Sequence, residues 1–360
     1  MCMKCKPRYR SLICSNFGLL LLLFFSCQEA ALIQIENSKL PKLYEAVFTS
    51  QSPQIDGQID SLWASGNWSD SFVDIEGVLT PKYKTRFKMM WDNHALYILA
   101  QLEEPHIWGT LQQRDTVIFY NNDFEVFIDP DGDTHDYMEL EINALNTAWD
   151  LFLNKPYLNK NKVDNQWNIE GLQSAVFYKG SLNDPSDVDQ GWTLEMALPW
   201  KSLSRGSKQE TAPINQFWRL NFSRVNWDFS INKGKYSRKK DPKGAYLPEY
   251  NWVWSPQGLI NMHLPEHWGY VYFSDKKGKQ IDYPEEAALV QWMYAQYREK
   301  AASEKKGQML EKKPVALWKG EKIFLEKRVL EDTVYYVSDN PHNQKTYRIR
   351  ADGKLDVRSR

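Results

Sequence analysis

The chain has 360 residues, with 45 Lys and Arg against 46 Asp and Glu. This length supports a large hydrophobic core, and a charged fraction of 25% excludes both a polytopic membrane protein and a disordered chain. A net charge of −1 argues against nucleic acid as a partner, because neutralising phosphates requires a basic surface. The 15 Trp, 19 Tyr and 16 Phe either fill a core or stack on flat ligands.

The first 26 residues have the pattern of a signal peptide. Four cations between Lys4 and Arg10 precede an apolar run from Phe17 to Phe25 that is too short to span a bilayer. Ser26 and Cys27 follow, which resembles a bacterial lipoprotein signal, where cleavage leaves a lipid-modified cysteine at the N-terminus. We predict lipid attachment at Cys27 and a location in the cell envelope, periplasmic or surface-exposed. A secretion signal with an incidental cysteine is the alternative.

Cleavage before Cys27 would remove four cations and no acids, which changes the net charge from −1 to −5. Residues 27–43 are predicted as a tether. Residues 44–276 are predicted as an antiparallel β-sandwich, because short alternating runs are separated by turn residues. The expected strands cover residues 86–91, 95–102, 124–129, 137–143, 149–153, 175–178, 191–198, 217–224 and 268–273.

Residues 277–360 are predicted as a helix followed by short strands. Asp282 and Pro284 are typical of a helix start, and Lys305 to Gly307 of a helix end. Between them, helical spacing relates five residues, Leu289, Trp292, Met293, Gln296 and Tyr297. A small meander is expected from residues 322–326, 334–337 and 346–350.

A series of motifs then carries a family resemblance. The run Ile55-Asp-Gly-Gln-Ile-Asp-Ser-Leu-Trp63 resembles the opening signature of carbohydrate-binding module family 9. Further motifs follow in the family's order, at residues 91–93, 122–129, 139–143, 191–200, 218–224, 252–256 and 263–269. The resemblance covers residues 45–274 and is greatest to stand-alone bacterial lipoproteins without a catalytic module.

The resemblance implies a β-sandwich that binds sugars, in the best-known members at chain ends and between two aromatic faces. By motif, Glu125 matches a sugar-contacting glutamate, and Glu141 stands where family members have an arginine. The family's two stacking tryptophans correspond to positions near Phe119, with Trp108 upstream as a substitute, and near Met262.

Aromatic rings and polar side chains near the expected loops are therefore candidates for sugar contacts. The predicted carbohydrate-binding residues are Trp108, Glu125, Glu141, Asn143, Trp149, Arg224, Trp254 and His263, with Trp227 as a further ring. Other tryptophans are expected to fill the core, because they lie inside strands or apolar runs: Trp63, Trp91, Trp192, Trp200, Trp218, Trp252 and Trp268.

A hard cation is the one cofactor that the sequence suggests. Asp129, Asp131 and Asp133 alternate around a turn as the ligands of calcium loops do, and Asp136 is a further candidate ligand. The family often carries structural calcium, whereas a solvated Asp-Gly turn explains the same residues without a metal.

We predict a monomeric, lipid-anchored module that binds an oligo- or polysaccharide without catalysis, in support of glycan capture or degradation. One alternative is a protein acting on O-glycosyl bonds, with Glu125 paired to Glu141 or Glu195. It is not favoured, because no motif of a known catalytic centre is present. The other is a haem b electron-transfer module, with Met89, Met90, Met138, His94 and His263 as candidate ligands.

Overall fold

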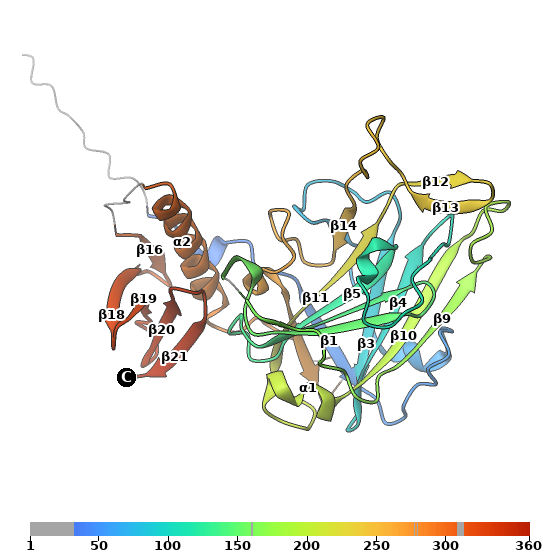
Figure 1. Ribbon diagram of the computed structural model, residues 1–360. Helices are drawn as coiled ribbons and strands as arrows, with labels where there is room; N and C mark the ends of the chain where they lie inside the picture. Colours follow the sequence, from blue (N-terminus) through green and yellow to red (C-terminus); the bar gives the residue numbers. More distant parts are fainter. Residues whose placement is uncertain (1–31, 160, 277, 279, 308–312) are drawn as a thin grey trace, which may run out of the picture.

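A computed structural model describes residues 32–159, 161–276, 278, 280–307 and 313–360. These residues fold mostly as β strands, in a large curled sandwich and a smaller C-terminal unit beside it (Figure 1). The predicted signal peptide and Cys27 lie outside the described residues. In the described ranges, no helix is long and apolar enough to cross a membrane.

The sandwich is one continuous sheet of 13 strands. Eleven of them follow the order β8-β7-β6-β5-β11-β15-β1-β3-β4-β10-β9, and β14 pairs with β11 and carries β2. The strands are β1 Leu43–Phe48, β2 Val73–Asp74, β3 Thr85–Trp91, β4 Ala95–Glu103, β5 Asp123–Asp129, β6 Tyr137–Asn143, β7 Ala148–Leu153, β8 Val163–Asp164, β9 Gln173–Lys179, β10 Gly191–Pro199, β11 Phe217–Asn226, β14 Tyr250–Val253 and β15 Gly269–Ser274.

The predicted β-sandwich is confirmed, but its pairing is not antiparallel throughout. Strand β1 runs parallel to both of its neighbours, β15 and β3, and so joins the two layers into one curled sheet. Alternation reports which face a strand buries, but it does not report the direction of the neighbouring strand. The mixed pairing therefore left no signal in the sequence.

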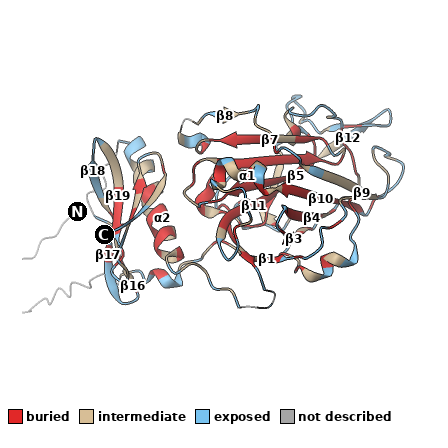
Figure 2. Ribbon diagram, turned by 90° about the horizontal axis from the view of Figure 1, so that it is seen from below, coloured by how far each residue is buried: buried red, intermediate tan, exposed pale blue. Residues whose placement is uncertain are grey.

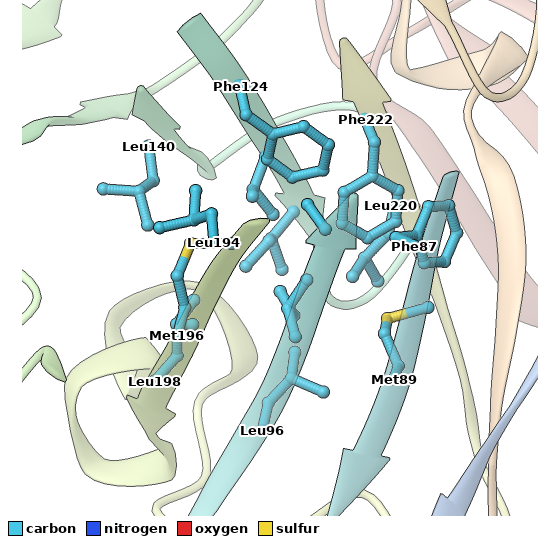
Figure 3. Packing of buried hydrophobic residues seen from close by; sticks show 14 of the residues in the cluster. Phe87, Met89, Leu96, Phe124, Leu140, Leu194, Met196, Leu198, Leu220 and Phe222 are labelled. Carbon is cyan, nitrogen blue, oxygen red and sulfur yellow. The ribbon is translucent and has the colours of Figure 1, made fainter. Parts of the chain in front are cut away.

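The main core lies between the two layers of the sheet (Figure 3). Strands β3, β4, β5, β10 and β11 each contribute alternate side chains to it, because successive residues of a strand point to opposite faces. Burial is densest on these strands (Figure 2). The seven tryptophans expected in the core are all buried, with exposed fractions of 0–3%.

Shorter elements decorate the sheet. They are the helix α1 Trp200–Ser207, the hairpin strands β12 Phe229–Asn232 and β13 Lys235–Arg238, and the 3-10 turns η1 Ile35–Asn37, η2 Ser61–Ser65, η3 Ile118–Tyr120, η4 Tyr157–Asn159 and η5 Pro265–His267. The sequence does not predict α1, because this helix is too short to show a periodic pattern.

The C-terminal unit contains the expected helix and meander, and a separate two-stranded hairpin that the sequence did not distinguish from the meander. Its elements are α2 Ala287–Lys305, the hairpin β16 Val315–Trp318 with β17 Glu321–Phe324, and the meander β18 Glu326–Leu330, β19 Thr333–Asp339, β20 Lys345–Arg350 and β21 Leu355–Ser359. Four residues of the predicted helical stripe are buried, namely Leu289, Trp292, Met293 and Tyr297.

The segment predicted as a tether makes specific contacts with this C-terminal unit. The Ile35 side chain is fully buried in the same apolar cluster as Met293, and the Leu317 amide donates a hydrogen bond of 2.9 Å to the Ile33 carbonyl. The chain therefore passes the C-terminal unit before it enters β1 of the sandwich.

Candidate functional site

A cavity of about 330 Å³ opens beside strands β5, β6 and β7, on the face opposite the main core. Carboxyl and aromatic side chains dominate its walls. It is lined by Phe119, Glu125, Phe127, Glu139, Glu141, Trp149, Leu151, Tyr157, Val225, Glu249, Asn251, Met262 and His263. This size suits one or two sugar rings, so we refer to it as the carboxyl pocket.

Strand register explains why these side chains meet. Glu125 on β5 lies directly opposite Glu141 on β6, which in turn lies opposite Trp149 on β7. The neighbours Val126 and Leu140 point the other way, into the main core. Alternation in three adjacent strands thus builds one wall of the pocket from residues far apart in the sequence.

Four carboxyl groups lie on this wall or just behind it. Oxygens of Asp123, Glu125 and Glu141 lie within 4.8 Å of one another, and Glu139 also lines the pocket. Asp123 is fully buried, and the other three side chains are at most 5% exposed. The group is therefore a compact acidic cluster that is largely withdrawn from solvent.

Burial disfavours the charged form of these carboxyls. It raises the pKa of Glu125 to about 7. For Asp123, Glu139 and Glu141, burial and then repulsion from the neighbouring carboxyls raise the pKa well above its usual range. Without a cation nearby, part of the cluster holds protons at neutral pH.

Aromatic side chains form the rest of the pocket. Trp149 comes from β7, and Phe119 and Tyr157 come from the loops around it. The ring of Tyr157 meets the edge of His263 at a centroid distance of 4.4 Å, and Tyr137 Oη lies 2.9 Å from His263 Nδ1. Enclosure lowers the pKa of His263 to about 3, so the imidazole is neutral at pH 7.

The structure brings together four of the eight predicted sugar-binding residues, namely Glu125, Glu141, Trp149 and His263. The positions near Phe119 and Met262, which the resemblance marks for stacking, also line the pocket. Here they supply one aromatic ring and one flexible thioether.

The other four predicted sugar contacts lie outside the pocket lining. Asn143 is fully buried, donates to the Leu111 carbonyl at 2.8 Å and so holds a loop in place. Arg224 forms a buried ion pair with Glu104 at 2.6 Å. Two rings are buried as well: Trp254 in the main core, and Trp108 in a small cluster with Tyr236.

Several residues that line the pocket were not among the predicted contacts, and they include Glu139, Tyr157 and Glu249. Glu139 shares the face of Glu141, and their spacing of two along β6 was a usable signal for it. Tyr157 and Glu249 reach the pocket from loops, and only the tertiary fold brings them there.

Of the candidates for the two alternative functions, the pair Glu125 and Glu141 meets in the carboxyl pocket, and the others are dispersed. Glu195 lies away from the carboxyl pocket, where its carboxylate accepts hydrogen bonds from Trp63 Nε1 and from the Asp56 and Gly57 amides. The predicted haem ligands Met89, Met90 and Met138 are fully buried in apolar clusters, and His94 is exposed.

The predicted calcium residues do converge. Oxygens of Asp129, Asp131 and Asp133 lie within 4.8 Å of one another. Two lysines already compensate part of their charge, since Lys354 Nζ lies 2.9 Å from Asp133 and Lys208 Nζ lies 3.2 Å from Asp131. The oxygen donors fit a hard cation, but the lysines would have to move or share the site.

The loop amides also use these carboxylates. Asp129 is fully buried and accepts hydrogen bonds from the Gly132 and Thr134 amides at 3.1 and 2.9 Å. Asp136 is half-exposed and lies 3.8 Å from Lys354 Nζ. The loop is therefore held by its own hydrogen bonds as well as by charge.

Comparisons with known proteins find similarity to one family over part of the chain. Residues 55–223 match the family described as carbohydrate family 9 binding domain-like. Exoglucanase XynX from Acetivibrio thermocellus is 28% identical over 202 residues, which are 54% of this chain and 15% of that protein. Endo-1,4-beta-xylanase A from Thermoanaerobacterium saccharolyticum is 24% identical over 174 residues, 46% of this chain and 12% of that protein. The chain thus spans about one seventh of the length of these relatives.

Solved structures are similar at lower identity. A family 9 carbohydrate-binding module from Caldicellulosiruptor kristjanssonii in complex with cellotriose is 17% identical, with a TM-score of 0.43; the alignment covers 67% of this chain and 100% of that one. A putative carbohydrate-binding protein from Bacteroides uniformis is 15% identical, with a TM-score of 0.48, over 65% of this chain and 99% of that one. Residues 55–223 of this chain are therefore similar to the carbohydrate family 9 binding domains.

Proposed function

We propose that this protein binds carbohydrate, without catalysis, in the carboxyl pocket. The observation that carries the proposal is the meeting of Glu125, Glu141 and Trp149 in one cavity within the family-matched segment. An aromatic ring packs on the apolar face of a sugar, and carboxyl groups accept hydrogen bonds from its hydroxyls. The relatives that match this segment are an exoglucanase and xylanases, so plant-type glycans are the first ligands to test.

A glycan array followed by calorimetry tests the proposal. We expect binding to at least one oligosaccharide, and a roughly fivefold loss of affinity in Trp149→Ala, because a stacked ring contributes about 1 kcal/mol. Phe324→Ala is the matched control, since this half-exposed ring lies on β17 in the C-terminal unit. No binding to any plant, algal or host glycan would refute the proposal.

We also propose that Cys27 carries lipid and tethers the domain to the cell envelope, where captured glycan supports degradation. The order of cations, apolar run and Ser26-Cys27 supports this. Fatty-acid labelling of the native chain and of Cys27→Ser tests it, with Cys14→Ser as the control. Equal labelling of the native chain and Cys27→Ser would contradict lipid attachment at this cysteine.

We propose calcium as a structural ion at Asp129, Asp131 and Asp133, on the convergence of their oxygens. Binding to the native state alone raises stability by mass action. Thermal unfolding is therefore expected to shift to higher temperature with calcium, and this shift should disappear in Asp131→Asn. A melting temperature that is the same in EDTA and in calcium would rule the ion out.

A further inference from the structure

The acidic cluster of the carboxyl pocket lacks a compensating cation in the described part of the chain. None of its four carboxyls takes part in an ion pair there, and Arg224 is committed to Glu104. The neutral His263 supplies no positive charge. Position 141, where the family resemblance implies an arginine, here adds one more acid.

Several polar atoms around the pocket are buried without a partner. Among the described residues, no group donates a hydrogen bond to Glu139 Oε2 or to Asp123 Oδ2, and Trp149 Nε1 has no acceptor. The Glu139 side chain lines the cavity and is 95% buried. A buried acceptor without a hydrogen-bond partner costs free energy. A ligand that donates a hydrogen bond to it removes this cost and therefore binds more tightly.

The spacing of the acceptors fits one particular donor. Oxygens of Glu125 and Glu141, which line the pocket, and of Asp123, which lies behind them and does not line it, are within 4.8 Å of one another. A primary ammonium has three N–H donors in tetrahedral directions, which at charge-assisted lengths of about 2.8 Å reach oxygens about 4.6 Å apart. Hydroxyl groups of a neutral sugar supply donors too, but no charge.

We propose that the carboxyl pocket selects a sugar with a free amino group, whose ammonium lies against Glu125 and Glu141 with Asp123 behind them. This inference rests on the proposed function and specifies its ligand. The sugar ring would contact Trp149 and Tyr157, which leaves Glu139 to accept from a hydroxyl. N-acetylation removes the charge and adds bulk, so the acetylated sugar is disfavoured.

The burial of the cluster agrees with this assignment. Burial raises the pKa of each of its carboxyls, and repulsion from a nearby carboxyl adds to the shift in every case, so the cluster lacks the positive charge that would stabilise its ionised form. An ammonium supplies the positive charge that the cluster lacks. The aromatic rings across the pocket cover the carbon skeleton of the same sugar. A hydrated divalent cation would leave those rings unused.

Calorimetry of the full chain with four probes tests the inference. The probes are a glucosamine disaccharide, its di-N-acetyl form, cellobiose, and calcium chloride alone. We expect the glucosamine disaccharide to bind at least tenfold more tightly than the two neutral sugars. Glu125→Gln and Glu141→Gln, made separately, should remove most of this preference, and the exposed Glu210→Gln should keep it. Far-UV circular dichroism confirms that each variant is folded.

The outcomes distinguish the inference about an amino sugar from the proposed binding of carbohydrate. Equal or tighter binding of cellobiose or of the acetylated sugar overturns the inference and leaves carbohydrate binding standing. Calcium binding that is lost in Glu125→Gln and kept in Asp131→Asn, with no preference among the sugars, assigns the cluster to a metal and also overturns it. If no sugar binds, both the inference and the proposed function are refuted. The comparison among ligands on the native chain is decisive even if a variant is unstable.

Discussion

Glu125 is held where its charged form is unfavourable, because burial raises its pKa to about 7. The carboxyl of the unfolded chain titrates near 4.5, so between these two pH values the folded chain binds more protons than the unfolded one. The protonated carboxyl of Glu125 therefore contributes stability that is fully present below about pH 4.5 and is lost as the pH rises through 7. At this residue, the needs of a ligand pocket oppose those of stability.

Replacing the carboxyl by an amide therefore makes stability less dependent on pH. Glu125→Gln is expected to unfold with a free energy up to about 3 kcal/mol higher than the native chain at pH 8. The gain should shrink to nearly zero at about pH 4, where the carboxyl is protonated in the folded chain and mostly protonated in the unfolded chain. Urea unfolding at both pH values measures it, with Glu210→Gln as the control. A difference that does not change with pH would contradict the raised pKa.

Gly269, at the start of β15, is fixed by close packing. A Cβ atom there would lie 2.1 Å from Cζ3 of the buried Trp254. Gly269→Ala is expected to lower the free energy of unfolding by about 3 kcal/mol, because the indole must move within a packed core. Gly66→Ala is the matched control, since its Cβ would meet no atom closer than 3.4 Å. Equal thermal midpoints for the two variants would refute this account.

The helix α2 shows what an element contributes beyond its own propensity. Its residues Leu289, Met293 and Tyr297 are buried against the meander strands, together with Ile35 from the other end of the described chain. Most of the stability of a helix within a protein comes from such packing rather than from its own propensity. The apolar face of α2 therefore holds the C-terminal unit together.

Truncating the centre of that face should loosen the unit. Met293→Ala removes a fully buried side chain and is expected to cost about 2–4 kcal/mol. The exposed Glu299 lies on the opposite face, so Glu299→Ala should change stability by less than about 0.5 kcal/mol. Hydrogen exchange of the α2 amides reports the effect locally. Unchanged protection of these amides in Met293→Ala would show that packing of this side chain does not determine the stability of α2.

At the scale of the whole molecule, the C-terminal unit is docked on the sandwich by polar contacts. Arg298 of α2 pairs with the buried Glu266 of η5 at 2.6 Å. The turn before β21 meets the aspartate loop, where Thr134 Oγ1 donates to the Gly353 carbonyl at 3.0 Å. The loop proposed for calcium is thus also part of the joint between the two units.

Breaking the buried pair should separate the units. In Glu266→Ala, Arg298 is left without its partner in a partly buried place, and we expect a loss of about 3 kcal/mol. Limited proteolysis between residues 275 and 286 should become faster. Glu304→Ala, which removes an exposed pair with Lys327, is the control. If both variants resist protease equally, this ion pair does not hold the joint.

The sequence by itself determined the β-sandwich, most of its strands, the C-terminal helix and the burial of the seven tryptophans expected in the core. These follow from alternation and helical spacing, which are local properties of the chain. It also marked Glu125 and Glu141, because the motif order placed them on adjacent strands.

Only the tertiary structure decided which candidates share a pocket. Strand pairing and loop paths brought Tyr157, Glu249 and His263 to Glu125, and they left Arg224 and Trp254 in buried positions elsewhere. The same holds for the parallel pairing of β1 and for the burial of Ile35 against α2. Such contacts depend on long-range geometry, which residue patterns within a single strand do not encode.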